Sequence, residues 1–269
     1  MKNQEQIKRT VKEKYSTIAM ESYRNNSCCS CGCLEESSKS NPVVKDEYKN
    51  LDGYMPDADL GLGCGIPTEY ARLKKGDTVV DLGSGAGNDC FVARAAVGEE
   101  GLVIGLDMSE PMVHKARENA IIQGYNNVEF HVCEIEQMIL EDNTADVVIS
   151  NCVLNLVPAK RKVLSEIYRI LRPGGHFSIS DIVLNNPLPG SLKTQAELYV
   201  GCIAGASLKK EYMAYIEESG FKNIEVLVEK EIPLQEEWLK EFLSESEIKQ
   251  LHEANPGIRT ITIYAEKPT

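Results

Sequence analysis

Short apolar segments alternate with helical segments along most of this chain, and this alternation constrains the fold more strongly than any other feature. The sequence predicts seven strands, which read TVVDL, LVIGLD, VEFHVC, ADVVISN, HFSISDIV, IEVLVE and RTITIYAE. Helices are predicted among the first five strands at residues 89–97, 111–123 and 160–171. Strands that are joined through helices pair in parallel, because the chain must return to the same end of the sheet. We therefore predict an α/β fold with a doubly wound, mostly parallel, seven-stranded sheet.

The beginning of the chain follows a different pattern. Residues 4–23 place Ile7, Val11 and Tyr15 at helical spacing, which predicts one amphipathic helix, and residues 25–42 form a polar, cysteine-rich loop. We divide the chain into an N-terminal helix and cysteine-rich leader at 1–53 and one α/β domain at 54–269. Within that domain, RPGG is predicted as a turn, with helices at 67–73, 192–205 and 209–219 and a helical insert at 235–253.

Composition and charge narrow the range of partners. The net charge is −12 and the sequence pI is about 5.0, without the basic stripe that is typical of nucleic-acid binding. No apolar run reaches the ~18 residues of a membrane helix, and the N-terminus lacks the apolar core of a signal peptide. We therefore expect a cytoplasmic monomer without nucleic-acid or membrane partners. Its nine cysteines are then expected to be thiols rather than disulfides.

A glycine-rich turn follows the first predicted strand. The segment DLGSGAGND places Gly83, Gly85 and Gly87 where the backbone can turn tightly and approach a ligand closely. Asp107 ends the second strand, where a carboxylate can accept hydrogen bonds from both hydroxyl groups of a ribose. Dinucleotide-binding enzymes share these parts, so the pattern alone indicates a nucleotide-type cofactor.

The same region resembles the class I S-adenosylmethionine-dependent methyltransferases. The resemblance covers residues 77–181 and includes D-x-G-x-G-x-G, Asp107, the acidic segment at 134–136 and the RPGG turn. It implies that Asp81 and the glycines face the methionine part of S-adenosylmethionine and that Asp107 holds the ribose. The candidate cofactor residues are therefore Asp81, Gly83, Ser84, Gly85, Gly87, Asp107, Met108, Glu134, Ile135 and Asn151, with Met108 against the adenine and Glu134 and Ile135 at its edge.

Three cysteines stand where the acceptor of the methyl group would bind. Cys152 follows the fourth strand, Cys202 follows the fifth, and Cys64 lies in LGLGCG ahead of the first strand. A single buried cysteine is usually only a small apolar side chain. Three thiolates that converge at the carboxyl ends of the strands suit a soft ion with three pyramidal bonds, such as trivalent arsenic.

Four segments, LGLGCG, DLGSGAGNDCFVA, SNCVLNLVP and GCIAGA, together resemble the arsenite S-adenosylmethionine methyltransferases between residues 54 and 221. This resemblance implies that Cys64, Cys152 and Cys202 bind trivalent arsenic as the substrate and carry the catalysis. It also implies that an N-terminal cysteine takes part in redox cycling with thioredoxin or glutathione as the reductant. The candidates are Cys28, Cys29, Cys31 and Cys33, and the sequence does not choose among them.

Two other functions remain open at this point. A small-molecule C- or O-methyltransferase of the quinone type has the same fold and cofactor site, and a soft-metal-binding protein could keep the fold as a scaffold. Neither explains both an intact glycine loop and three cysteines in matching positions. Cys90 is predicted to pack against the sheet, with a redox role left open, and Cys133, which ends a strand, is predicted to be structural. His114 and His131 are predicted to lie at the surface or in a strand, and His176 is predicted to be exposed.

Overall fold

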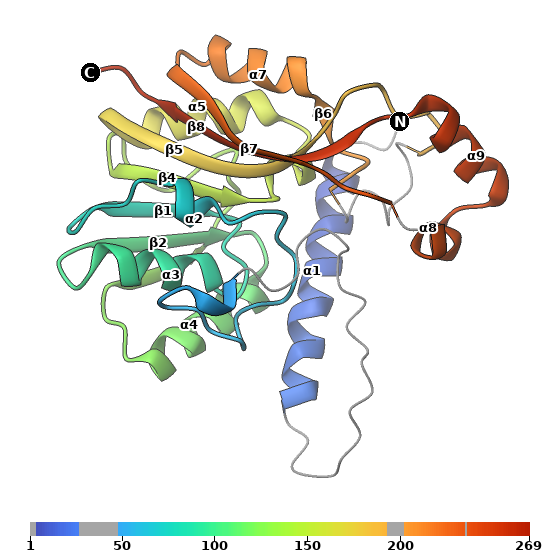
Figure 1. Cartoon of the computed structure of the whole chain (residues 1–269). Helices are drawn as coiled ribbons and strands as arrows, with labels where there is room; N and C mark the ends of the chain where they lie inside the picture. Colours follow the sequence, from blue (N-terminus) through green and yellow to red (C-terminus); the bar gives the residue numbers. More distant parts are fainter. Residues whose placement is uncertain (1–3, 27–47, 193–201, 235) are drawn as a thin grey trace.

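The computed structural model describes residues 4–26, 48–192, 202–234 and 236–269. A single sheet runs through its centre in the order β3-β2-β1-β4-β5-β8-β7, and the short strand β6 pairs with β5 (Figure 1). The strands are β1 (Thr78–Leu82), β2 (Leu102–Asp107), β3 (Val128–Val132), β4 (Ala145–Asn151), β5 (Leu171–Leu184), β6 (Ser207–Leu208), β7 (Lys222–Glu231) and β8 (Ile258–Glu266). The helices are α1 (Gln4–Asn26), α2 (Pro67–Tyr70), α3 (Asn88–Val97), α4 (Glu110–Gln123), α5 (Lys160–Ile170), α7 (Lys209–Glu218), α8 (Glu236–Phe242) and α9 (Glu245–Ala254), with single turns η1 (Tyr48–Asn50) and η2 (Leu154–Leu156).

The strand order confirms the predicted doubly wound sheet. β1 pairs in parallel with β2 on one side and with β4 on the other, so the chain changes direction across the sheet between these neighbours. Among the strands that the structure describes, only the pairs that involve β8 are antiparallel. In such sheets the crevice outside the carboxyl ends of the strands at this switch point is the usual ligand site.

Alternate residues of the central strands pack into two different cores, one on each face of the sheet. Val80 and Leu82 join Leu164 and Ile167 of α5 on one face. Val79 of the same strand joins a cluster on the other face that includes residues of α3 and α4. Strands buried on both faces read as continuous apolar runs, which is why TVVDL and ADVVISN are strong strand signals. The two cores together fix the ends of β1, β2 and β4, from which the site is built.

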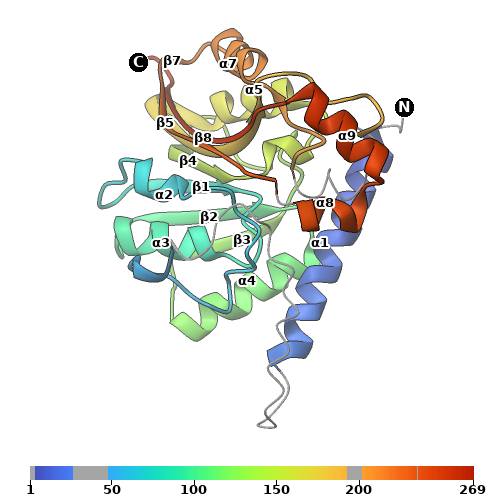
Figure 2. The same ribbon diagram turned by 45° about the vertical axis from the view of Figure 1, so that its right-hand side comes forward.

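Helix α1 lies beside the sheet near the carboxyl ends of the central strands, where it packs against α4 (Figures 1 and 2). Its apolar face buries Val11 and Ala19 completely or nearly so. The predicted amphipathic helix is therefore confirmed. Among the described residues, no helix combines the length and apolar character that crossing a bilayer requires.

Several local predictions differ from the structure. The RPGG segment is not a turn but lies inside β5, at the point where the register with β4 shifts. A Cβ atom at Gly175 would lie 2.8 Å from the Asp146 carbonyl oxygen, so glycine allows the two strands to approach closely there. Residues 202–205 are not helical, while 193–201 lie outside the described residues. The insert forms two helices, α8 and α9, because Ser244 and Glu247 build a capping box that starts a new helix. His176 is half-buried rather than at the surface, and its Nε2 lies 2.7 Å from the Ala71 carbonyl oxygen.

Candidate active site

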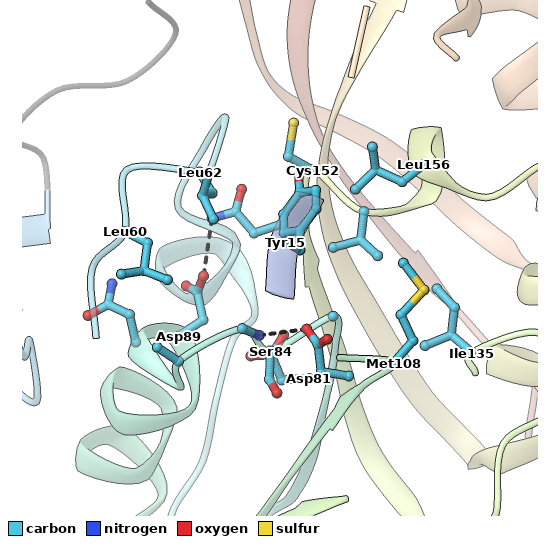
Figure 3. Close-up of a pocket in the computed structure, with 18 of the residues that line it drawn as sticks. Tyr15, Leu60, Leu62, Asp81, Ser84, Asp89, Met108, Ile135, Cys152 and Leu156 are labelled. Carbon is cyan, nitrogen blue, oxygen red and sulfur yellow. Dashed lines mark hydrogen bonds between the residues drawn. The ribbon is translucent and has the colours of Figure 1, made fainter. Parts of the chain in front are cut away.

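A pocket opens at the switch point, beyond the carboxyl ends of β1, β2 and β4 (Figure 3). Met108 and Ile135 lie side by side at one end, and Leu60 and Asp89 lie at the other. Tyr15 of α1 reaches into the same space beside Cys152. The pocket is lined by all but one of the predicted cofactor residues, namely Asp81, Gly83, Ser84, Gly85, Asp107, Met108, Glu134, Ile135 and Asn151.

The glycine loop between β1 and α3 lies tightly against its surroundings. Gly83 has a φ of +69°, and a Cβ atom there would lie 2.5 Å from a methyl group of Val153. At Gly85, φ is +53° and a Cβ atom would meet nothing within 4 Å, so the loop faces open space at this point. Gly87 does not line the pocket. It begins α3 with a φ of +99°, and its missing side chain leaves room for Phe91 and Phe130.

Asp107 is held by the backbone on the floor of the pocket. Its Oδ1 accepts a hydrogen bond from the Ser109 N–H (2.8 Å), and its Oδ2 accepts one from the Gly85 N–H (3.0 Å). Burial raises the pKa of this carboxyl, and the two backbone hydrogen bonds act in the opposite direction. The carboxylate is therefore fixed in place before any ligand arrives, which lowers the entropy cost of binding a ligand at this position.

Asp81 is buried at the end of β1 and shares its carboxylate with Cys90. The Cys90 thiol donates a hydrogen bond to Asp81 Oδ2 (3.2 Å), and the thiol is fully buried, as predicted for a core cysteine. Burial and the charge of Asp89 raise the pKa of Asp81 well above its usual value. A cationic ligand group beside Asp81 would favour its charged form, and the amino group of a methionine moiety has this charge.

Asn151 connects the end of β4 to the loop that carries Cys64. Its Oδ1 accepts a hydrogen bond from the Cys64 N–H (2.9 Å), and its Nδ2 donates to the Gly65 carbonyl (2.9 Å) and to the Tyr48 hydroxyl (2.7 Å). Tyr48 in turn donates to Asp89 Oδ1 (2.8 Å). No role for Tyr48 or Asp89 was predicted, because their hydrogen-bond partners come from distant parts of the chain. Asn151 was predicted to contact the cofactor, and the hydrogen bonds in the structure hold the Cys64 segment.

The three predicted arsenic ligands belong to one cluster of buried side chains, but Cys202 is not in the group of ligand atoms that lie closest together. The sulfurs of Cys64 and Cys152 and a carboxylate oxygen of Asp181 all lie within 4.8 Å of one another. The Cys202 thiol donates a hydrogen bond to the Cys152 carbonyl oxygen (2.9 Å). All three cysteines are at most 2% exposed. Cys152 also lines the cofactor pocket, so the thiol cluster and the pocket share a wall.

Two of these cysteines have an unfavourable backbone conformation. Cys152 has a φ of +60° and Cys202 a φ of +61°, in the left-handed region that non-glycine residues seldom adopt. Each such residue costs about 1 kcal/mol, and residues of this kind concentrate at functional sites. A glycine at either position would remove this strain. The backbone conformation alone therefore does not favour cysteine at either position.

A buried polar network that was not predicted from the sequence lies beside the cysteines. Asp181 of β5 accepts hydrogen bonds from Asn155 Nδ2 (2.7 Å) and from the Tyr212 hydroxyl (3.1 Å). Burial raises the pKa of Asp181 to about 7, although the nearby charge of Lys160 lowers it. The detectable signal was a carboxylate inside the apolar strand HFSISDIV. Burial also raises the pKa of the Cys64 thiol to about 11, so this thiol holds its proton at neutral pH.

The raised pKa of Asp181 predicts a pH-dependent difference between wild type and the Asp181→Asn variant. In the folded protein this carboxyl holds its proton up to about pH 7, against 3.8 for an unperturbed group. Its contribution to stability is therefore complete below about pH 4 and is lost as the pH rises to about 7. The asparagine variant stays neutral and does not lose this contribution. The difference in unfolding free energy, variant minus wild type, should therefore increase by up to ~4 kcal/mol between pH 4 and pH 8.

Chemical denaturation of both proteins across this pH range measures that difference. Asp142→Asn, which removes an exposed carboxylate near Arg169, is the matched control and should show little change with pH. A difference between Asp181→Asn and wild type that stays constant from pH 4 to pH 8 would contradict the assignment.

Helix α1 contributes Lys8, Val11 and Tyr15 to the wall of the pocket. Lys8 Nζ forms ion pairs with Glu134 Oε2 (2.8 Å) and Glu136 Oε1 (2.7 Å), and Ser16 Oγ lies 3.0 Å from Ser109 Oγ. Tyr15 is close enough to Asp107 and to the three cysteines for their charges to act on its hydroxyl, and burial raises its pKa. One helix thus reaches both the cofactor pocket and the thiol cluster. The cysteines at 28, 29, 31 and 33 lie outside the described residues.

The chain is similar to proteins of known function in sequence and in structure. A family model described as a methyltransferase domain matches residues 73–220. The arsenite methyltransferase of Halobacterium salinarum is 40% identical over 82% of this chain and 59% of that protein. The arsenite methyltransferase of Mus musculus is 32% identical over 70% of this chain and 52% of that protein. The chain therefore spans between about half and three fifths of the length of these two relatives.

A solved structure supports the same similarity. The crystal structure of CrArsM, an arsenic(III) S-adenosylmethionine methyltransferase from Chlamydomonas reinhardtii, matches with a TM-score of 0.64 and 32% sequence identity. The match covers 86% of this chain and 72% of that chain.

Proposed function

Because this chain belongs to the arsenite S-adenosylmethionine methyltransferase family, we propose that it transfers a methyl group from S-adenosylmethionine to trivalent arsenic held by Cys64, Cys152 and Cys202. The observation that carries this proposal is the shared wall between the cofactor pocket and the thiol cluster, formed by Cys152. A quinone methyltransferase needs the pocket but has no use for a buried group of thiols beside it. The methylated arsenicals are then the products of a detoxification reaction.

The pocket has the groups that S-adenosylmethionine requires. Ser84 Oγ is buried and has no hydrogen-bond partner among the described residues, so it is available to a polar ligand atom. The open space above Gly85 gives a ligand close access to backbone N–H groups. We propose that Asp81 binds the amino group, Asp107 the ribose, and Met108 and Ile135 the adenine. The bound cofactor supplies a methyl group on a positively charged sulfur, which the arsenic lone pair takes as the arsenic–carbon bond forms and the carbon–sulfur bond breaks.

The thiols exchange places with the hydroxyl groups of arsenous acid. Each arsenic–sulfur bond replaces one arsenic–oxygen bond, and the thiol proton leaves with the hydroxide as water. The raised pKa of Cys64 and Cys152 therefore does not prevent binding, because every proton held by a thiol is needed to form water. Burial excludes bulk water from the bound arsenic, and the fixed cysteine backbones orient its lone pair. Positioning of this kind is the main source of rate acceleration in a displacement reaction.

The methylated arsenic is formally pentavalent and must return to the trivalent state. We propose that a pair of cysteines supplies the two electrons and closes a disulfide as arsenic is reduced. An external dithiol or thiol, thioredoxin or glutathione, then restores the pair by disulfide exchange. Cys28, Cys29, Cys31 and Cys33 remain the candidates for the additional thiol.

The ion pairs of Lys8 predict that α1 contributes to cofactor affinity. Lys8→Ala removes both contacts with the segment after β3 and should weaken S-adenosylmethionine binding by about 3–10-fold, because partly buried charged hydrogen bonds contribute about 1 kcal/mol. Isothermal titration calorimetry measures the affinity. Arg9→Ala is the matched control, since Arg9 is exposed and pairs only with Glu13 on the same helix. An equal effect of both variants would show that α1 does not seal the pocket.

A comparison of acceptors tests the proposed substrate. The reduced protein is incubated with S-adenosylmethionine and either arsenite or a demethylated quinone, and S-adenosylhomocysteine is measured in both reactions. We expect product only with arsenite. Product with the quinone alone would favour the quinone-type function over this proposal.

A further inference from the structure

Two thiols and one carboxylate converge in the buried cluster, and this donor set differs from the three thiols proposed for arsenic. The potential ligand atoms of Cys64, Cys152 and Asp181 all lie within 4.8 Å of one another. Each of these residues is at most 2% exposed to solvent. We propose that these three residues bind a thiophilic divalent cation, Zn²⁺ or Cd²⁺, in the space that arsenic would occupy. The cation and arsenite then exclude each other.

The chemistry of the donors suits such a cation. Zinc and cadmium accept both thiolate and carboxylate ligands, whereas trivalent arsenic is satisfied by three sulfurs. Tetrahedral zinc places its donor atoms about 3.3–3.8 Å apart, given zinc–sulfur distances of about 2.3 Å. Small side-chain rotations that bring the three atoms into this range would complete the geometry. The two thiol protons pass to the buffer when the cation binds.

Asp181 is oriented for this role by the groups behind it. Asn155 Nδ2 and the Tyr212 hydroxyl donate hydrogen bonds to its two oxygens, at 2.7 and 3.1 Å. Carboxylates that bind metals are commonly fixed in this way, and their partners affect metal affinity. An arsenic trithiolate makes no use of this carboxylate, so its place within reach of two sulfurs is explained better by a cation.

The charges also balance. Two thiolates and one carboxylate carry three negative charges, which a divalent cation and the partly buried Lys160 neutralise. Lys160 lies close enough to Asp181 and Cys202 for their charges to interact, and its Nζ donates to the Gly205 carbonyl (2.7 Å). A buried metal site without net charge avoids the large desolvation cost of an uncompensated charge.

Cadmium is the probe for this site, because thiolate ligands give it an ultraviolet charge-transfer absorbance. The full chain is used with serine at positions 28, 29, 31 and 33, so that the N-terminal cysteines do not bind the ion. We expect one tightly bound Cd²⁺ per chain. Asp181→Asn should weaken Cd²⁺ binding by at least about tenfold, since loss of a group behind a ligand already costs about 10–100-fold. Arsenite affinity should change by less than about threefold, because all three thiols remain.

Two further variants make the result decisive. Asp142→Asn removes an exposed carboxylate remote from the cluster and should leave Cd²⁺ binding unchanged. Cys202→Ser should abolish arsenite binding, while Cd²⁺ binding should fall by less than it does in Cys64→Ser. This comparison tests the donor set even if Asp181→Asn does not fold.

Unchanged Cd²⁺ affinity in Asp181→Asn, or equal loss of Cd²⁺ binding in Cys202→Ser and Cys64→Ser, would overturn the inference. Neither measurement requires methyl transfer, so the cation site and the proposed methyltransferase function are tested independently. A protein that binds Cd²⁺ as described but does not methylate arsenite contradicts only the proposed function. Competition is read directly, because one equivalent of arsenite should displace the Cd²⁺ absorbance.

Discussion

Replacing Cys152 with serine should lower the rate of arsenite methylation by at least about a hundredfold while leaving S-adenosylmethionine binding within about twofold of wild type. The serine oxygen keeps the size of the side chain but is a hard ligand, so arsenic loses one of its three bonds to sulfur. Cys64→Ser and Cys202→Ser should have the same effect. The cofactor pocket should be unaffected, because Cys152 contributes only its wall and none of the groups that hold Asp107.

The measurement is the initial rate of methylarsenical formation, with cofactor affinity determined separately by calorimetry. Thermal unfolding of each variant shows whether the fold is retained. Turnover of arsenite by Cys152→Ser at the wild-type rate would contradict the assignment of the ligand.

Replacing Asp107 with asparagine should have the opposite pattern. One carboxylate oxygen becomes an NH₂ group, which must then face the N–H of Gly85 or of Ser109. A donor that faces a donor loses a hydrogen bond and leaves a buried polar group without a partner. We expect S-adenosylmethionine affinity to fall by about 10–100-fold, on the basis of about 1.5–3 kcal/mol for a hydrogen bond to a charged group.

Arsenite binding to the reduced thiols should remain unchanged in the Asp107→Asn variant. It can be measured without cofactor, by the protection of the cysteines from alkylation. Wild-type cofactor affinity in this variant would contradict the role of Asp107. A combined loss of cofactor and arsenite binding would point to a general disruption of the fold.

The fold was predictable because its signals are local. TVVDL and ADVVISN are apolar segments that form strands buried on both faces of the sheet. The glycine-rich segment DLGSGAGND forms the predicted turn between the first strand and the helix that follows it. The RPGG segment misled the prediction, because glycine and proline also occur at an irregularity within a strand. The break between α8 and α9 depends on one capping box, which a charged helical pattern conceals.

The site was predictable only where single residues carry a recognisable pattern. Cys64, Cys152 and Cys202 could be named from their positions and from the family resemblance, and the structure brings them together. Asp181 and Lys160 could not be named, because their effect depends on burial beside sulfurs from other segments. The hydrogen-bond partners of Asn151 also could not be predicted from the sequence. Its position at the end of β4 placed it at the site, but only the three-dimensional structure links it to the Cys64 loop.

The most direct test of the central claim is a single turnover of the pre-reduced protein with arsenite and S-adenosylmethionine that carries a labelled methyl group. Arsenic species are separated after the reaction, and the label in each is counted. The proposed function predicts that labelled methylarsenic forms in an amount close to that of the protein and does not form in the Cys152→Ser variant. Label that stays on the cofactor, at the level of a reaction without protein, would contradict it.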